Sequence, residues 1–185
     1  MSLTKTPICD FGKKAENFKL KSTNGKIISL HDIKGTNGTL IMFICNHCPY
    51  VKAVINDIVE DCKHLKEVGI NSIAICSNDT MNYPEDSFDR MIEFSNDNEF
   101  NFPYLIDETQ SIAKKYDAVC TPDFFGYNNN LELQYRGRIR ELKNLEPVQD
   151  GESDLLKAMK MISKSGQGPK DQLPSMGCNI KWFKN

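Results

Sequence analysis

The order of patterns along the chain predicts an α/β fold, in which a central mixed β-sheet is flanked by helices. Continuous apolar runs at 39–44 and 70–76 are typical of strands that are buried on both faces. Between these runs, apolar residues recur every three or four positions from Val51 to Leu65, which indicates an amphipathic helix. The length of 185 residues matches one domain, with a body at 1–165 and a tail at 166–185 that belongs to the same domain.

A β-hairpin is expected before the first buried strand, as an N-terminal extension of the sheet. Segments 18–21 and 26–30 flank Asn24-Gly25, and both residues of such a pair tolerate the positive φ angles of a tight turn. After the second buried strand, Pro84 and two acidic residues mark the start of a further helix, because exposed N–H groups favour them there.

The remaining elements follow in a simple order. We expect a short strand at 102–107, a short helix at 108–116, a strand entered at 119–126, a turn at 128–130, a last strand at 131–138 and a helix at 154–163. The C-terminal tail is expected to pack on the body. Trp182 and Phe183 are the predicted anchors, because burial of two aromatic side chains offsets the entropy lost on ordering.

Composition and charge exclude several classes of partner. The chain has 23 Lys and Arg against 25 Asp and Glu, and its mean hydropathy is −0.47. These values argue against a basic nucleic-acid surface spread over the domain and against a polybasic membrane anchor. No apolar signal segment follows Met1, and the longest apolar run, 40–45, is too short to cross a membrane. We therefore expect a cytoplasmic protein without nucleic-acid or membrane partners.

The motif Cys45-Asn46-His47-Cys48 lies where the first buried strand ends and the helix begins. Free N–H groups at a helix N-terminus stabilise a thiolate over a thiol. The first cysteine is thus the expected nucleophile, and the second can attack the resulting mixed disulfide. A protonated His47 would lower the thiol pKa further, and Pro49 suits the first helical position because its missing N–H costs nothing there.

A zinc site is the alternative interpretation of this motif. Four-ligand zinc sites generally contain a second paired motif, whereas the other candidate ligands are scattered at Cys62, His64, Cys76 and Cys120. We therefore favour redox chemistry and expect no metal and no cofactor. A metal-binding or adaptor module that uses Cys45, His47 and Cys48 stays open as a non-enzymatic alternative.

Thr121-Pro122 is the second element of interest. A proline that opens a strand after a short helix is a candidate for a cis peptide bond, although most X–Pro bonds are trans. A cis-proline beside the cysteine pair would present the backbone groups of Thr121 to an extended substrate chain.

The order of these elements resembles the thioredoxin fold with a peroxiredoxin-type N-terminal extension. More narrowly, the run CNHCPYVK at 45–52 is similar to a motif of bacterial thioredoxin-like redoxins, as are the segments at 83–86, 120–125, 135–138 and 177–182. The resemblance covers nearly the whole chain. It implies a thiol–disulfide oxidoreductase in which Cys45 attacks, Cys48 resolves and Pro122 is the facing cis-proline.

The chain departs from thioredoxins in two respects. Asn46-His47 replaces the Gly-Pro found between thioredoxin cysteines, and the strand at 39–44 lacks the buried acid that would accept a proton from Cys48. A thiol peroxidase of the peroxiredoxin type, with Cys48 as the attacking residue, is a second possibility. Peroxiredoxins carry a threonine three residues before that cysteine, whereas here Cys45 takes its place, which favours dithiol–disulfide exchange.

The chain has 7 cysteines, so one remains when the others are paired. Cys62 and Cys76 fall on apolar faces and are expected in the core, because unpaired cysteine is among the most buried residue types. Cys120 and Cys178 are candidate additional redox thiols, although Cys120 also fits a core position. The expected partners are protein or small-molecule thiols and disulfides and an electron donor that the sequence does not identify. The sequence also leaves the oligomeric state open.

Overall fold

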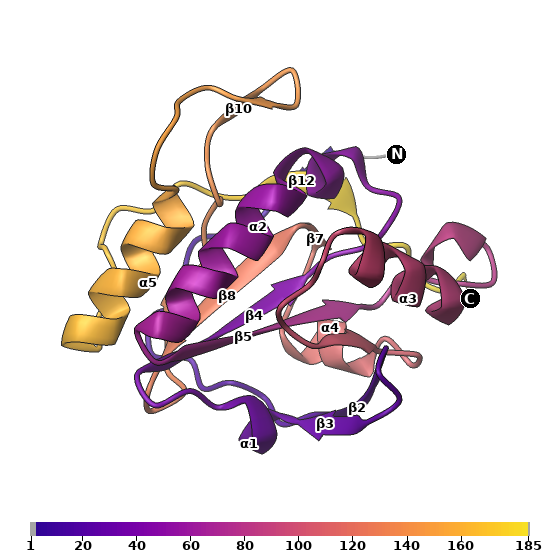
Figure 1. Ribbon diagram of the computed structural model, residues 1–185, viewed down its shortest axis with the longest axis horizontal. Helices are drawn as coiled ribbons and strands as arrows, with labels where there is room; N and C mark the ends of the chain where they lie inside the picture. Colours follow the sequence, from indigo (N-terminus) through magenta and orange to yellow (C-terminus); the bar gives the residue numbers. More distant parts are fainter. Residues whose placement is uncertain (1–2, 185) are drawn as a thin grey trace.

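The computed structural model describes residues 3–184 and confirms the predicted α/β architecture (Figure 1). Its main sheet has seven strands in the order β3-β2-β6-β5-β4-β8-β9. Strands β4, β5 and β6 run parallel at the centre, and the hairpin at one edge and β8–β9 at the other are antiparallel. The sheet is therefore mixed, as the sequence predicts.

The elements have the following bounds. The strands are β1 (Leu3–Lys5), β2 (Lys19–Ser22), β3 (Ile27–Ser29), β4 (Gly38–Phe43), β5 (Ile70–Cys76), β6 (Tyr104–Ile106), β7 (Cys120–Thr121), β8 (Asp123–Asn128), β9 (Leu133–Tyr135), β10 (Leu142–Lys143), β11 (Glu146–Pro147) and β12 (Met176–Asn179). The helices are α1 (Leu30–Ile33), α2 (Pro49–Glu67), α3 (Phe88–Asp97), α4 (Ser111–Lys115) and α5 (Asp154–Ser165), together with the 3₁₀ helix η1 (Pro84–Asp86).

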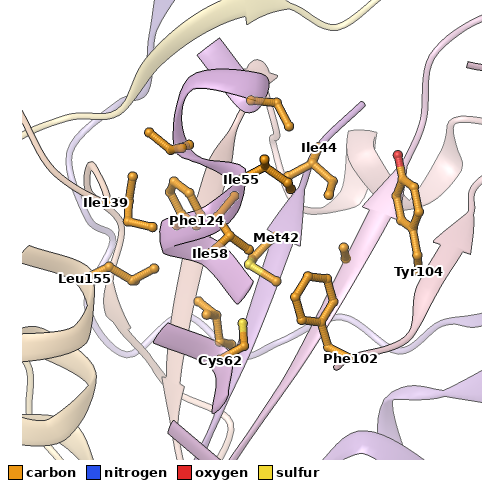
Figure 2. Packing of buried hydrophobic residues seen from close by; sticks show 14 of the residues in the cluster. Met42, Ile44, Ile55, Ile58, Cys62, Phe102, Tyr104, Phe124, Ile139 and Leu155 are labelled. Atoms are coloured by element: carbon orange, nitrogen blue, oxygen red, sulfur yellow. The ribbon is translucent and has the colours of Figure 1, made fainter. Parts of the chain in front are cut away.

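Strand β4 supplies the core on both faces of the sheet. Leu40 and Met42 point into one cluster with α2, α3 and α5, and Ile41 and Phe43 point into another with α1 and α4. This alternation follows from the period of two along a strand. Figure 2 shows Met42 packed near Ile58 of α2 on the first face. Because every side chain of β4 is buried, the end of this strand is a rigid base for the residues that follow it.

The hairpin forms as predicted, but its second strand is shorter than expected. Gly25 adopts φ +81° in the turn, and β2 also pairs with β6, so the hairpin continues the main sheet. Strand β3 ends at Ser29, which caps α1: its hydroxyl accepts the Asp32 backbone N–H, and the Asp32 carboxylate accepts the Ser29 backbone N–H in return.

The C-terminal tail differs from the expectation in its means of attachment. Trp182 and Phe183 are 37% and 46% exposed, so the prediction that they anchor the tail is wrong. Instead, β12 forms the middle strand of a second sheet, in the order β1-β12-β7, and carries Cys178 into the interior. Backbone pairing on both edges of β12 thus replaces aromatic burial as the anchor. The strand predicted to run from 131 to 138 is also shorter, since β9 covers Leu133–Tyr135.

Across residues 3–184, no helix is both long enough and apolar enough to cross a lipid bilayer.

Candidate active site

The cysteine motif connects β4 to α2. Cys45 lies just beyond the end of β4, Cys48 is the N-cap residue of α2, and Pro49 takes the first helical position, as expected. Both cysteines are almost completely enclosed, with exposed fractions of 1% for Cys45 and 0% for Cys48. A rigid strand end and a helix N-terminus therefore hold the two thiols in place, at a site that is closed to bulk solvent.

The Thr121–Pro122 peptide bond is cis and faces the two cysteines. Cys45 Sγ lies 3.2 Å from the Thr121 hydroxyl, and Cys48 Sγ, while protonated, donates to the Thr121 carbonyl at 3.1 Å. The two elements that the sequence singles out are thus brought into contact, although 73 residues separate Cys48 from Thr121.

The Thr121 backbone is not open to an extended substrate, in contrast to the expectation from the sequence. Strand β12 pairs antiparallel with β7, and Cys178 lies directly opposite Thr121 in this register. Gly177 allows the close approach, because a Cβ atom there would lie 2.0 Å from the Thr121 carbonyl oxygen. The tail of the same chain therefore covers the edge at which a substrate chain would pair.

Cys48 is the more acidic of the two thiols. A hydrogen bond from the Cys45 thiol, with further bonds from the Cys178 and Val51 backbone N–H groups, lowers the pKa of Cys48 to about 5. The hydrogen bond to Cys48, burial and the nearby Asp86 carboxylate together raise the pKa of Cys45 well above its usual value. This order is opposite to the prediction that Cys45 is the thiolate. The hydrogen bond from Cys45 is the largest cause, and the Val51 N–H group in the first turn of α2 adds to it because α2 begins directly after Cys48.

Asp86 of η1 supplies a buried carboxylate that the sequence did not assign to the site. Its Oδ1 accepts the backbone N–H groups of Asn46 at 2.8 Å and His47 at 3.3 Å, and its Oδ2 accepts the Asn78 side-chain amide at 2.7 Å. The ring Nδ1 of His47 lies 2.6 Å from the same Oδ2. Asp86 therefore fixes both the backbone between the two cysteines and the orientation of the imidazole ring.

The two members of this pair shift each other's pKa. The hydrogen bond to Asp86 raises the pKa of His47 above its ordinary value. Burial alone would raise the pKa of Asp86, but hydrogen bonds from His47 and Asn78 hold it below its ordinary value. The His47 ring also stacks on Tyr83, with ring centroids 5.7 Å apart and planes 9° apart. In the sequence, Asp86 is an acidic residue at a helix start. Its position after a buried strand is the one signal that could have indicated a residue of the site.

Within residues 3–184, Cys45, His47 and Asp86 form a group that could hold a metal ion. Their ligand atoms lie within 4.8 Å of one another. Three such ligands with an open position are typical of catalytic zinc, whereas structural zinc is generally bound by four. The set includes Asp86 in place of Cys48, so it differs from the metal-binding alternative that the motif suggested.

The other cysteines divide into two groups. The Cys178 thiol is hydrogen-bonded to the sulfur of Cys48, which brings a third thiol into the centre. Cys120 donates instead to the Pro122 carbonyl at 3.6 Å, and burial raises its pKa. Cys62 and Cys76 lie in the core, as expected, and burial raises the pKa of each to about 12. Of the two candidate extra thiols, the structure brings only Cys178 into contact with the pair.

A mixed sheet with a cysteine pair at the start of α2, opposite a cis-proline, defines a thioredoxin-like redoxin. The chain belongs to the AhpC/TSA family, whose model matches residues 11–142. It is also 30% identical over 117 residues to the thiol-disulfide oxidoreductase ResA of Bacillus subtilis. That match covers 63% of this chain and 61% of ResA, so the chain corresponds to about three fifths of that relative.

Solved structures support the same architecture. An uncharacterised conserved protein from Geobacillus kaustophilus is 37% identical, with a TM-score of 0.94 over 100% of this chain and 98% of the other. A hypothetical protein from Sinorhizobium meliloti is 32% identical, with a TM-score of 0.89 over 98% of each chain. The thioredoxin domain of a thiol-disulfide oxidoreductase from Bacteroides vulgatus shares the fold, with a TM-score of 0.58 at 13% identity over 72% of this chain and 89% of that one.

Proposed function

We propose that the protein is a thiol–disulfide oxidoreductase that passes two electrons between a substrate and the Cys45–Cys48 pair. The observation that carries the proposal is the contact between one acidified thiol and one that holds its proton, both facing a cis-proline. A reactive thiolate and a nearby thiol that can resolve its mixed disulfide are the two parts that such exchange requires.

The site supports a specific division of roles. The Cys48 thiolate attacks one sulfur of a substrate disulfide, which forms a mixed disulfide and releases the other sulfur as a thiolate. Cys45 then loses its proton and attacks the Cys48 sulfur, which forms the Cys45–Cys48 disulfide and releases the second substrate thiolate. This assignment exchanges the roles expected from the sequence, because hydrogen bonds from the Cys45 thiol and from the Cys178 and Val51 N–H groups favour the thiolate at Cys48.

The His47–Asp86 pair is the proposed acceptor for the proton of Cys45. Its ligand atoms lie within 4.8 Å of the Cys45 sulfur, and His47 Nε2 has no hydrogen-bond partner among the described residues. The pair thus serves as the proton acceptor in place of the buried acid that β4 lacks.

Two serine variants test these roles. With oxidised glutathione as a small disulfide and insulin as a protein disulfide, Cys48→Ser should abolish exchange. Cys45→Ser should stop at a disulfide on Cys48, either with the substrate sulfur or with another thiol of the chain, which mass spectrometry detects. Cys62→Ser, a core thiol away from the site, is the matched control and should keep its activity. Full exchange by Cys48→Ser would refute the assignment. Mixed disulfides on Cys45 in that variant would assign the attack to Cys45, as the sequence predicts.

A thiol peroxidase is the second candidate, and the acidity of Cys48 favours it. The Cys48 sulfur is enclosed at the first turn of α2, so a small oxidant such as hydrogen peroxide reaches it more easily than a protein disulfide. Stopped-flow measurement of peroxide consumption by the reduced protein separates the two functions. If the second-order rate constant is no larger than that of an unactivated thiol, the peroxidase function is refuted and the exchange function remains.

The metal-binding alternative has a direct test. Elemental analysis of protein purified without added metal should show no stoichiometric zinc or copper if Cys45 and His47 serve in redox exchange. One equivalent of metal that is lost in Asp86→Asn would favour a metal centre at Cys45, His47 and Asp86. We further propose a reducing, cytoplasmic setting, which cell fractionation would test.

A further inference from the structure

The tail strand β12 occupies the position of an extended substrate beside the cis-proline. It runs antiparallel to β7, with Cys178 opposite Thr121 and Asn179 opposite Cys120. Antiparallel addition of an extended segment to a sheet edge is a common mode of peptide recognition. Here the added segment belongs to the same chain, and the residue that it places next to the cysteine pair is itself a cysteine.

Cys178 contacts Cys48 through both its backbone and its side chain. The Cys178 N–H group and thiol are each hydrogen-bonded to the Cys48 sulfur, and the Thr121 carbonyl, from the strand opposite, accepts from the same sulfur when it is protonated. The Cys45 thiol is the other sulfur partner of Cys48. The Cys48 sulfur is thus hydrogen-bonded to two thiols, Cys45 on one side and Cys178 on the other.

The segment after β12 holds Cys178 in this position. The Lys181 N–H donates to Asn78 Oδ1 at 2.9 Å, and the Lys181 carbonyl accepts from the Asp79 N–H and from the Gln110 side chain, both at 2.8 Å. Asn78 also donates to Asp86, so one side chain links the tail to the His47–Asp86 pair. On the other edge, β1 pairs with β12 through Leu3–Lys5. The fold therefore holds the Cys178 thiol in a defined position, as a functional site requires.

We propose that Cys178 is a third redox thiol, which exchanges with the Cys45–Cys48 disulfide to form a Cys48–Cys178 disulfide. This inference rests on the proposed exchange function. The Cys178 sulfur, as a thiolate, attacks the Cys48 sulfur, so that the Cys48–Cys178 bond forms and the Cys45–Cys48 bond breaks. Cys45 leaves as a thiolate and takes up the proton that Cys178 released. The step is an internal exchange, so it consumes no external oxidant or reductant.

The position of Cys178 in β12 determines which disulfides can compete with it for Cys48. Cys178 is 4% exposed and β12 covers the Thr121 edge, so a protein disulfide would reach Cys48 only after β12 left β7. The internal exchange needs no such movement. The tail therefore acts as an internal substrate: it competes with large external disulfides and leaves small disulfides and oxidants as the substrates that reach Cys48 with β12 in place.

Disulfide mapping tests the proposal directly. Trypsin places Cys45 and Cys48 together in peptide 35–52, and Cys178 alone in peptide 171–181. The full-length Cys45→Ser variant is equilibrated in a glutathione redox buffer, alkylated and digested. We expect the cross-linked pair 35–52/171–181 to be the main oxidised form of this variant, and a minor form of the wild-type protein. Adding Cys178→Ser should remove the cross-link and leave Cys48 glutathionylated, whereas adding Cys9→Ser should change nothing.

The outcomes separate this proposal from the proposed function. Glutathionylation of Cys48 in folded Cys45→Ser protein, with no cross-link to 171–181, would overturn the role of Cys178. A cross-link to peptide 116–136 would instead assign the role to Cys120 and would also overturn it. Absence of a Cys45–Cys48 disulfide in oxidised wild-type protein would refute the exchange function itself. Circular dichroism of each variant shows that the comparison is made on folded protein.

Discussion

The Asp86 carboxylate lies 2.6 Å from His47 Nδ1 and also accepts the backbone N–H groups of Asn46 and His47. One buried side chain therefore holds the loop between the two cysteines and raises the pKa of His47 within it. A carboxylate that accepts several N–H bonds is strongly favoured in its ionised form. The shape and the electrostatics of the motif thus depend on a residue 39 positions away.

Replacement of Asp86 by asparagine should lower the pKa of His47 toward its ordinary value, because the hydrogen bond that His47 donates to Asp86 is the largest cause of its increase. NMR titration of the imidazole ring measures the shift. Asp89→Asn, which changes an exposed acid on the adjacent helix, is the control and should leave the titration unchanged. An unchanged His47 pKa in Asp86→Asn would contradict the coupling.

The same pair predicts a pH dependence of stability. Since the pKa of His47 is raised in the folded state, its contribution is fully present below its unfolded pKa of about 6.5 and is lost as the pH rises through the folded pKa. The pKa of Asp86 is lowered, so its contribution is present above about pH 4 and is lost as the pH falls through its folded pKa. Urea unfolding of wild type across this range should show both losses, and Asp86→Asn should show neither.

Cys48 should titrate near pH 5, far below an ordinary thiol, because the Cys45 thiol and two backbone N–H groups stabilise its thiolate. Ultraviolet thiolate absorbance of the reduced protein measures this transition, which Cys48→Ser should remove. Cys178→Ala should raise the pKa of Cys48, since it deletes a hydrogen-bond donor, whereas Cys178→Ser should keep it low because a hydroxyl can still donate. Equal effects of alanine and serine would argue against this hydrogen bond.

Gly177→Ala should displace β12 from β7, because the new Cβ atom would lie 2.0 Å from the Thr121 carbonyl oxygen. We expect Tm to fall by roughly 5 °C or more and alkylation of Cys48 to become faster. Leu133→Ala, on the opposite face of the sheet, is the control for global destabilisation. If it accelerates alkylation as much as Gly177→Ala does, the effect does not arise from local opening of β12.

The buried ion pair of Asp123 and Arg136 should be costly to break. Arg136 donates to both carboxylate oxygens, at 3.3 Å and 2.9 Å, and Asp123 is fully buried. Arg136→Met leaves a buried acid without its partner, which costs about 3–5 kcal/mol. Urea unfolding measures this loss. The double variant Asp123→Asn/Arg136→Met should recover part of the lost stability, whereas an equal or greater loss would show that packing of the arginine dominates.

Much of the fold could be predicted from periodicity. The buried runs that form β4 and β5, the amphipathic pattern of α2 and the Asn24-Gly25 turn each specify local structure, so these elements were found with small errors at their ends. The tail could not be predicted in this way. Its aromatic residues suggested burial, but backbone pairing of Met176–Asn179 with β1 and β7 determines its path, and pairing between distant segments leaves little trace in composition.

For the site, the sequence by itself determined the cysteine pair, its place at a helix N-terminus and the candidate cis-proline at Thr121–Pro122, which the resemblance to thioredoxins placed opposite the pair. These follow from local pattern, since a strand end, a helix start and a proline can each be recognised from a few neighbouring residues. Only the tertiary structure decided which thiol is acidic, which acid serves the site and which third cysteine joins it. The acidity of Cys48 depends on the hydrogen bonds that its sulfur receives from Cys45, Cys178 and Val51. Asp86 and Cys178 reach the centre through contacts across 39 or more positions of the chain.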